Sequence, residues 1–291
     1  MTKQERTERM QAGLLDWYRR SKRDLPWRHT RDAYAISVSE VMLQQTQVDR
    51  VKPRYDAWLK AFPTPKKLAA APTQKILSLW SGLGYNRRAL NLRKAAQVVV
   101  EQHNGVWPRT PEALQALPGF GPYTAAAVAI FSAQVHTSAV DTNVSRVIQR
   151  VFYGLRPQKA KVISAQALDA VPADVASWHH GLMDLGATVC ISQKPRCEIC
   201  PLQDICRAYP KILSQPARPR KAGVRFSDTD RFWRGHIIRL LTVQSAWPNT
   251  QLYKQLQSFG ALPRRRFQDI LNQLTKDGMI VAKKSQISLP E

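Results

Sequence analysis

The chain has 291 residues, and 44% of them are hydrophobic, so it is long enough for a packed core in one or two domains and is not a disordered polymer. Its 44 Lys and Arg residues against 21 Asp and Glu residues give a formal charge of +23, which favours nucleic acid as a partner over an anionic membrane. The charged N-terminus has no apolar signal core and no segment is apolar enough to span a bilayer, so we expect a cytoplasmic, nucleoid-associated protein.

Helical hydrophobic periodicity runs through most of the chain, and Gly and Pro residues separate the periodic segments. Helices are expected over residues 8–20, 36–45, from about 49 onward, 74–80, 87–102, 111–116, 122–133, 143–153, 158–170 and 175–189. No alternation typical of strands precedes residue 210. Residues 1–209 are therefore expected to form an all-α core.

The C-terminal part has a different pattern. Residues 210–226 hold three prolines and five basic residues, which is typical of a linker. Residues 227–291 predict helices near 230–243, 249–258 and 264–277, followed by a short hairpin. This order of elements predicts a small winged-helix-like domain after the linker.

The four cysteines lie close together, between Cys190 and Cys206. In a cytosolic protein such a group indicates a metal site rather than disulfides. Structural zinc is the main alternative, but it usually takes two closely spaced pairs, and only Cys197 and Cys200 form one. The spacing resembles that of the endonuclease III type of DNA glycosylase, which implies a [4Fe–4S] cluster on Cys190, Cys197, Cys200 and Cys206.

A turn with two glycines, LPGFGPYT at residues 117–124, lies between two expected helices. Gly119 and Gly121 remove side chains where the backbone must approach another group, and Pro122 suits the first position of the next helix. The free N–H groups at that helix start can bind an anion. An ordinary helix–helix turn is the alternative, but an acidic residue one helix later favours a helix–hairpin–helix motif that holds one DNA phosphate.

Two acidic residues suit the cleavage of an N-glycosidic bond. Asp141 begins an apolar helix and alone would be a helix cap, whereas Glu40 lies at the edge of an apolar helix and alone would be a solvated side chain. Together, one carboxylate can stabilise positive charge at the sugar C1′ while a protonated one acts on the leaving base. Adenine leaves poorly unless a ring nitrogen is protonated, so a dedicated acid such as Glu40 favours a purine substrate.

Over roughly residues 10–209 the chain resembles the MutY-type adenine DNA glycosylases of the helix–hairpin–helix superfamily. The matching segments, in family order, are LPWR at 25–28, SEVMLQQTQV at 39–48, GLGY at 82–85, LPGFGPYTA at 117–125, VDTNV at 140–144, MDLGA at 183–187 and the four cysteines. The resemblance implies a two-lobed core and the excision of adenine mispaired with 8-oxoguanine or guanine in double-stranded DNA by a monomer.

The resemblance also implies roles for single residues. Glu40 would protonate adenine and later handle water, while Asp141 would stabilise the oxocarbenium ion or form a transient adduct. Asn143 would position these two acids, and Tyr123 would line the reaction site. Relatives that also nick the strand have a Schiff-base lysine at the Tyr123 position, so a monofunctional enzyme is expected.

Further residues are assigned to DNA by the same resemblance. Gln45 and Tyr85 would enter the base stack, and Thr46 would contact the opposite base. The adenine pocket would include Leu25, Arg28 and Asp184. For Leu25 and Tyr85, a role in the packed core is the alternative.

The chain departs from the family in its C-terminal part. Typical members have a domain of the nucleotide-hydrolase fold that reads 8-oxoguanine, and residues 227–291 are too short for it. This part either holds duplex DNA or packs on the core; its candidate DNA contacts are Arg264, Arg265, Arg266 and Lys283. Thr142 replaces a usual glycine, and Asn86 replaces a frequent second aromatic residue.

Two other functions remain open at this stage. One is a thymine or uracil mismatch glycosylase on the same scaffold, and the other is a non-catalytic iron–sulfur protein that binds DNA or senses redox state. Glu40 within its LQQTQ context disfavours the first, and the retained Asp141 and Asn143 disfavour the second.

Overall fold

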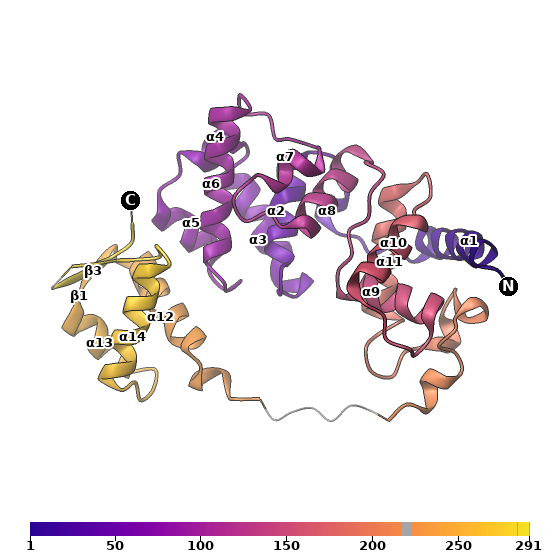
Figure 1. Cartoon of the computed structure of the whole chain (residues 1–291). Coiled ribbons are helices and arrows are strands. Elements are labelled where there is room, and N and C mark those ends of the chain that lie inside the picture. The colour runs from indigo at the N-terminus through magenta and orange to yellow at the C-terminus, as the bar shows by residue number, and fades with distance from the viewer. Residues whose placement is uncertain (217–222, 284, 291) are drawn as a thin grey trace. The chain divides into compact units, whose positions relative to one another are not determined.

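The computed structural model describes residues 1–216, 223–283 and 285–290, most of which are helical (Figure 1). The chain divides into two compact units, the first comprising Met1–Glu40, Pro108–Ala116 and Phe120–Arg220 and the second Val41–Trp107, Leu117–Gly119 and Lys221–Glu291. Within the described residues, no helix is both long and apolar enough to cross a membrane. The expected division into 1–209, 210–226 and 227–291 stays a prediction, and residues 217–222 of the expected linker lie outside the described residues.

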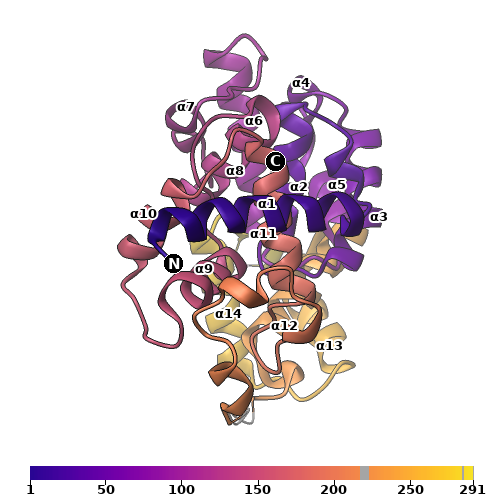
Figure 2. The same ribbon diagram turned by 90° about the vertical axis from the view of Figure 1, so that its right-hand side faces the viewer.

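The first unit is built from helices. They are α1 (Lys3–Ser21), the start of α2 (Ala33–Leu43), α7 (Pro111–Gln115), α8 (Pro122–Ala133), α9 (Thr142–Ile148), α10 (Ala160–Asp169) and α11 (Val175–Thr188). The long helix α1 runs across α11 (Figure 2). The two approach closely at Gly181, where a Cβ would lie 3.3 Å from side-chain atoms of both Leu14 and Tyr18.

The helices of the second unit between Val48 and Gln102 pack around tryptophans. They are α3 (Val48–Ala61), α4 (Pro65–Ala69), α5 (Thr73–Trp80) and α6 (Arg87–Gln102). Trp58 and Trp80 are fully buried and meet edge to face with ring centroids 5.3 Å apart. Such aromatic pairs anchor a core because each buries a large apolar area.

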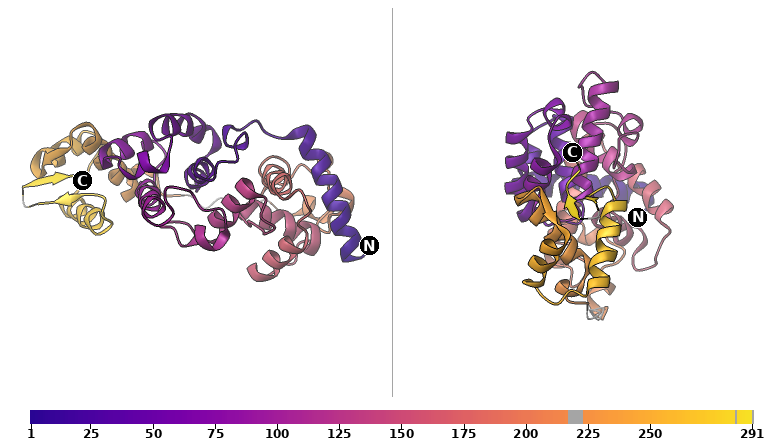
Figure 3. Two further views of the ribbon diagram at one scale, coloured as in Figure 1. Left: turned by 90° about the horizontal axis from the view of Figure 1, so that it is seen from above. Right: turned by 90° about the vertical axis from the view of Figure 1, so that its left-hand side faces the viewer.

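The C-terminal part of the second unit contains helices and short strands. They are α12 (Asp230–Val243), β1 (Ala246–Pro248), α13 (Asn249–Gln257), α14 (Arg264–Lys276), β2 (Val281–Ala282) and β3 (Gln286–Ser288). Strands of this part are drawn as arrows in Figure 3. The three strands form an antiparallel sheet in the order β1-β3-β2, in which Trp247 and Ala282 both pair with Ile287. Ile287 of this sheet and Phe267 of α14 are both fully buried.

The helices agree closely with the sequence prediction, and the differences have local causes. Helix α1 starts at Lys3 instead of residue 8 because Thr2 and Glu5 form a capping box. The expected helix 143–153 is α-helical to Ile148 and continues as a π-helical turn to Tyr153. Helix α4 and strand β1 were not predicted; they have five and three residues, and a strand of three residues is too short to show an alternating pattern.

Candidate active site and cysteine loop

Glu40 is a buried acid with an altered pKa. It lies on α2, and only 7% of it is exposed. Burial, and then the nearby charge of Asp141, raise the pKa of Glu40 to about 7, while a hydrogen bond from the Tyr123 hydroxyl and the charge of Arg28 oppose this rise. Near neutral pH a large share of Glu40 is therefore protonated, as a general acid requires.

Asp141 is the N-cap of α9. Its Oδ1 accepts the backbone N–H of Val144 at 2.7 Å, and its Oδ2 accepts the side-chain amide of Asn143 at 3.0 Å. These donors and the positive end of the helix stabilise a negative carboxylate. The carboxylate can in turn stabilise a cation placed beside it.

Asn143 is held in place from both sides. Its Oδ1 accepts Arg146 Nη2 at 2.7 Å, and the same guanidinium donates to the carbonyls of Gly186 at 2.6 Å and Cys190 at 2.8 Å. A Cβ at Gly186 would lie 2.6 Å from the Cβ of Asn143. Asn143 therefore has its position only because residue 186 has no side chain, and Arg146 links it to the first cysteine.

Tyr123 lies in the first turn of α8, directly after Pro122. Burial and the neighbouring acids Glu40 and Asp141 raise the pKa of Tyr123 well above its usual value. Its hydroxyl thus keeps its proton and donates to Glu40. The structure brings Glu40, Tyr123, Asp141 and Asn143 together in the first unit.

The two glycines of the hairpin have different environments. Gly119 has φ +84°, and a Cβ there would lie 2.8 Å from the Cβ of Asn91, so no side chain fits. Gly121 is the N-cap of α8, and within the described residues a Cβ there would meet nothing within 4 Å. The backbone at Gly121 is thus open to approach from outside the chain.

Asp184 is enclosed by two arginines. It is 1% exposed, and Arg28 binds it in a bidentate manner at 2.7 and 2.8 Å while Arg23 Nε donates to it at 2.6 Å. Although burial opposes ionisation, these hydrogen bonds and charges hold the pKa of Asp184 below its usual value. Because both oxygens of Asp184 accept hydrogen bonds from Arg28, Asp184 fixes the orientation of the Arg28 guanidinium. Leu25 is buried in the same unit, which agrees with its core alternative.

His180 was not identified from the sequence. It lines a pocket with Trp27 and Arg28, and its ring stacks on Phe131 with centroids 4.1 Å apart. Burial, and then the charge of Arg28, lower the pKa of His180 to about 3, so the ring is neutral. Its spacing of four residues from Asp184 on one helix face was the available signal.

Gln45 and Tyr85 lie on two loops of the second unit that one arginine ties together. Both residues have left-handed backbone, with φ 54° and 47°, and Tyr85 is 39% exposed, so it is not a core residue. Arg88 spans the two loops, and the hydroxyl of Thr46 accepts from it at 3.2 Å. Its carbonyl acceptors are Val41, Met42, Gln44, Leu83 and Gly84.

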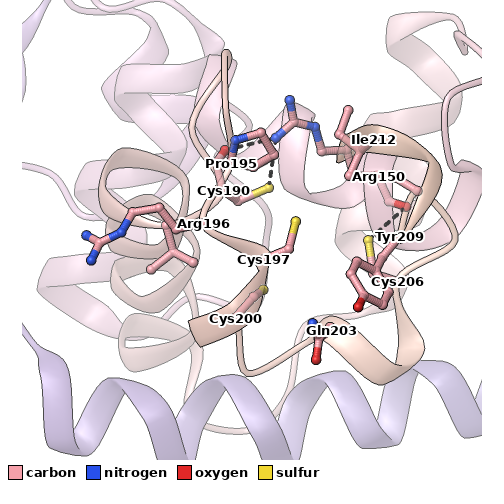
Figure 4. A pocket seen from close by; sticks show the side chains of 12 residues that line it. Arg150, Cys190, Pro195, Arg196, Cys197, Cys200, Gln203, Cys206, Tyr209 and Ile212 are labelled. Carbon is pink, nitrogen blue, oxygen red and sulfur yellow. Dashed lines mark hydrogen bonds between the residues drawn. The ribbon is translucent and has the colours of Figure 1, made fainter. Parts of the chain in front are cut away.

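The four cysteines line one pocket of about 330 Å³ (Figure 4). Cys190 follows α11, Cys197 and Cys200 flank one 3₁₀ turn, and Cys206 follows another. Arg150 donates to the Cys190 sulfur at 3.3 Å.

The donor set of this pocket fits an iron–sulfur cluster. Burial raises the pKa of Cys197 and Cys206, and that of Cys200 to about 12, so thiolates in this pocket need a cationic partner. Across the described ranges, no three His, Cys, Asp or Glu side chains are arranged around a single metal ion. A cluster instead takes one thiolate per iron, and four thiolates surrounding one space meet that requirement.

The chain matches known proteins along most of its length. Residues 38–173 match the model of HhH-GPD superfamily base excision DNA repair proteins, and residues 190–206 match the iron–sulfur binding domain of endonuclease III. The adenine DNA glycosylase of Mycolicibacterium smegmatis is 41% identical over 232 residues, which cover 78% of this chain and 78% of that protein. The adenine DNA glycosylase of Mus musculus is 44% identical over 229 residues, covering 72% of this chain and 44% of that protein.

Solved structures have the same fold. A thermostable thymine-DNA glycosylase superposes with a TM-score of 0.68 at 32% identity, covering 72% of this chain and 98% of that one. Endonuclease III, trapped as a covalent intermediate with DNA, superposes with a TM-score of 0.62 at 25% identity, covering 72% of this chain and 97% of that one. These similarities confirm the helical fold and the four iron–sulfur ligands expected from the sequence. The chain belongs to the MutY-type adenine DNA glycosylase family of the helix–hairpin–helix superfamily.

Proposed function

We propose that this adenine DNA glycosylase of base excision repair is monofunctional. It releases adenine mispaired with 8-oxoguanine or guanine from double-stranded DNA, acts as a monomer, and leaves an uncut abasic strand. The main support is the contact of Glu40, an acid with a pKa near neutrality, with Tyr123 beside a second acid, Asp141. The charge of +23 supports a nucleoid-associated protein in the cytoplasm.

Each acid has its own step in the proposed reaction. Glu40 donates its proton to a ring nitrogen of the flipped adenine, so that the electron pair of the C1′–N bond leaves with a neutral base. Asp141 stabilises the positive charge that develops at C1′. Glu40, now a carboxylate, accepts a proton from water as the water oxygen bonds to C1′, which restores the acid.

Tyr123 supports the monofunctional outcome. A Schiff base needs an amine, and a tyrosine hydroxyl cannot form one. The raised pKa of Tyr123 keeps it a neutral donor to Glu40 instead of a nucleophile. Asn143, held by Arg146, orients the Asp141 carboxylate.

The remaining residues are proposed to hold DNA. Gly121 offers its open backbone to a phosphate, and the left-handed loops carry Gln45 and Tyr85 into the base stack, with Thr46 toward the opposite base. Arg28, oriented by Asp184, faces the flipped base. Extrusion of a base costs a few kcal/mol, least for a mispair, and these contacts offset it.

The cysteine pocket has a proposed supporting role. Cys190, Cys197, Cys200 and Cys206 hold the [4Fe–4S] cluster, which when bound cross-links the loop through four Fe–S bonds. Arg146 connects the carbonyl of Cys190 to Asn143, so the loop supports the position of the catalytic Asp141.

The test is single-turnover base release from duplexes with adenine opposite 8-oxoguanine, adenine opposite guanine, and thymine or uracil opposite guanine. Fast adenine release from the first two, without borohydride-trappable adducts, is expected. Release of thymine or uracil alone would overturn the role of Glu40, and a trapped adduct would overturn the monofunctional assignment.

A further inference from the structure

The second unit contains a groove whose walls come from distant parts of the chain. One wall includes Gln45 and the loop that ends at Tyr85, and the other includes Phe226 and the α12 residues Arg231 and Phe232. The empty volume between them is about 2290 Å³. The groove therefore borders both residues that are proposed to enter the base stack.

Helix α12 is fixed beside α5 in this unit. The side-chain amide of Gln74 on α5 donates to the carbonyl of Thr242 on α12 at 3.0 Å. The guanidinium of Arg231 lies 4.5 Å from the centre of the Tyr85 ring, within the range of a cation–π contact. The C-terminal part thus touches one of the proposed stacking residues directly.

The positive charge of this groove is only partly compensated. Arg234 pairs with Asp277, which also lies 3.9 Å from Arg87. Within the described part of the chain, neither Arg50 nor Arg231 pairs with a carboxylate. Uncompensated arginines that line one groove attract a polyanion, and phosphates bind guanidinium groups in a bidentate manner.

The groove also exposes aromatic surface. Phe226 is 60% exposed, and its ring meets Phe232 edge to face with centroids 5.8 Å apart. An exposed aromatic ring in the same groove as arginines that pair with no carboxylate is a combination that binds nucleotides, since the base stacks and the phosphate pairs with the cation. A neutral apolar partner would leave Arg50 and Arg231 desolvated without compensation.

The arginines of α14 are less suited to this task. Arg266 Nε donates to Asp230 at 2.8 Å, and Arg264 lies over the ring of Tyr253 at 4.5 Å. Both contacts lie within the C-terminal helices, and neither arginine lines the groove beside Gln45 and Tyr85. Arg265 is exposed on the same helix, which makes it a matched control for charge removal.

We infer that the α12 face with Arg231, together with Phe226, binds the DNA strand opposite the excised adenine, next to Gln45 and Tyr85. This inference rests on the proposed action on duplex DNA. The phosphates flanking the opposite base contact Arg231 and Arg50, and Phe226 contacts the base or sugar beside them. The C-terminal part is then a strand-binding element beside Gln45 and Tyr85 in the second unit.

The test uses the full-length, cluster-containing protein and fluorescence anisotropy. The duplexes hold an abasic analogue opposite guanine, with natural phosphates or with neutral methylphosphonates flanking the opposite base on either strand. Arg231→Gln should weaken binding about 10-fold, as for loss of one charged contact, and lower the salt slope by about one. Phe226→Ala should weaken binding by about 10-fold because a stacking surface is lost.

The strand is identified by a double-perturbation cycle. Methylphosphonates on the opposite strand should weaken wild-type binding but add little to Arg231→Gln, because they remove the same contact. Methylphosphonates on the adenine strand should weaken the binding of the wild-type protein and of Arg231→Gln by the same factor, because they remove a different contact. Arg265→Gln should change binding less than about 2-fold, since one exposed charge that does not line the groove contributes little.

Two outcomes would overturn the inference. One is equal losses for Arg231→Gln and Arg265→Gln, and the other is additive effects of Arg231→Gln and the opposite-strand methylphosphonates. Adenine release by the wild-type protein is measured separately. If the wild-type protein releases no adenine, the proposed function is refuted. If it releases adenine but Arg231→Gln binds DNA as tightly as the wild-type protein, only the role of α12 is refuted.

Discussion

Replacement of Glu40, the proposed catalytic acid, should stabilise the protein, and the amount should depend on pH. Because the pKa of buried Glu40 is raised from 4.5 to about 7, holding the ionised carboxylate in the fold costs roughly 3 kcal/mol, at about 1.4 kcal/mol per pKa unit. The protonated form of Glu40 is favoured in the fold. Its contribution to the free energy of unfolding is present in full below the pKa of the unfolded state and is lost as the pH rises through about 7. Glu40→Gln removes the titration and keeps an acceptor for Tyr123.

We expect Glu40→Gln to be more stable than the wild-type protein by roughly 3 kcal/mol at pH 8.5, and by less than about 1 kcal/mol at pH 5. Urea unfolding at both pH values measures the difference. Glu101→Gln, which removes an exposed carboxyl on α6, is the control and should change little at either pH. Equal stabilisation by Glu40→Gln at both pH values would refute the argument, because the effect would then not come from ionisation.

Three further predictions concern the reaction. The single-turnover rate of adenine release should fall as pH rises through about 7, since Glu40 loses its proton. Glu40→Gln should lower this rate by about 10²–10⁴-fold and abolish its pH dependence. Asp141→Asn should lower the midpoint of any Glu40 titration, measured by ¹³C NMR, because Asp141 contributes to the raised pKa; an unshifted midpoint would contradict that coupling. Gly186→Ala should displace Asn143 and slow adenine release about 10-fold or more while the visible absorbance of the cluster is kept, and an unchanged rate would show that Asn143 is not needed in that position.

Features that depend on the spacing of residues close together in the chain could be predicted from the sequence. The cysteine spacing and the motif segments defined the family, and periodicity predicted most helices. The chemistry of the reaction and the resemblance suggested pairing Glu40 with Asp141, but no local pattern could show that they meet, since 100 residues of chain separate them. Their proximity, and the pKa that follows from it, depend on packing that no local pattern encodes.

Other parts of the site could not be predicted for the same reason. Arg146 is three residues from Asn143, a helical spacing that suggests contact, but its bonds to Gly186 and Cys190 join distant segments. The contact of Arg231 with Tyr85 also joins distant segments and gives no sequence signal. The candidates Arg264 and Arg266 looked free in the sequence, whereas in the fold they contact Tyr253 and Asp230.

Arg88 has a consequence for the kinetics of DNA binding. Because one guanidinium holds the carbonyls of both loops, a displacement of the Gln45 loop strains the bonds to the Tyr85 loop as well. The backbones that carry Gln45 and Tyr85 are therefore coupled, and we expect the proposed entry of the two side chains into a base stack to be one event. An enzyme scanning undamaged DNA would test each base pair with both side chains together, so its dwell time at a pair reports the stacking strength of both strands at once.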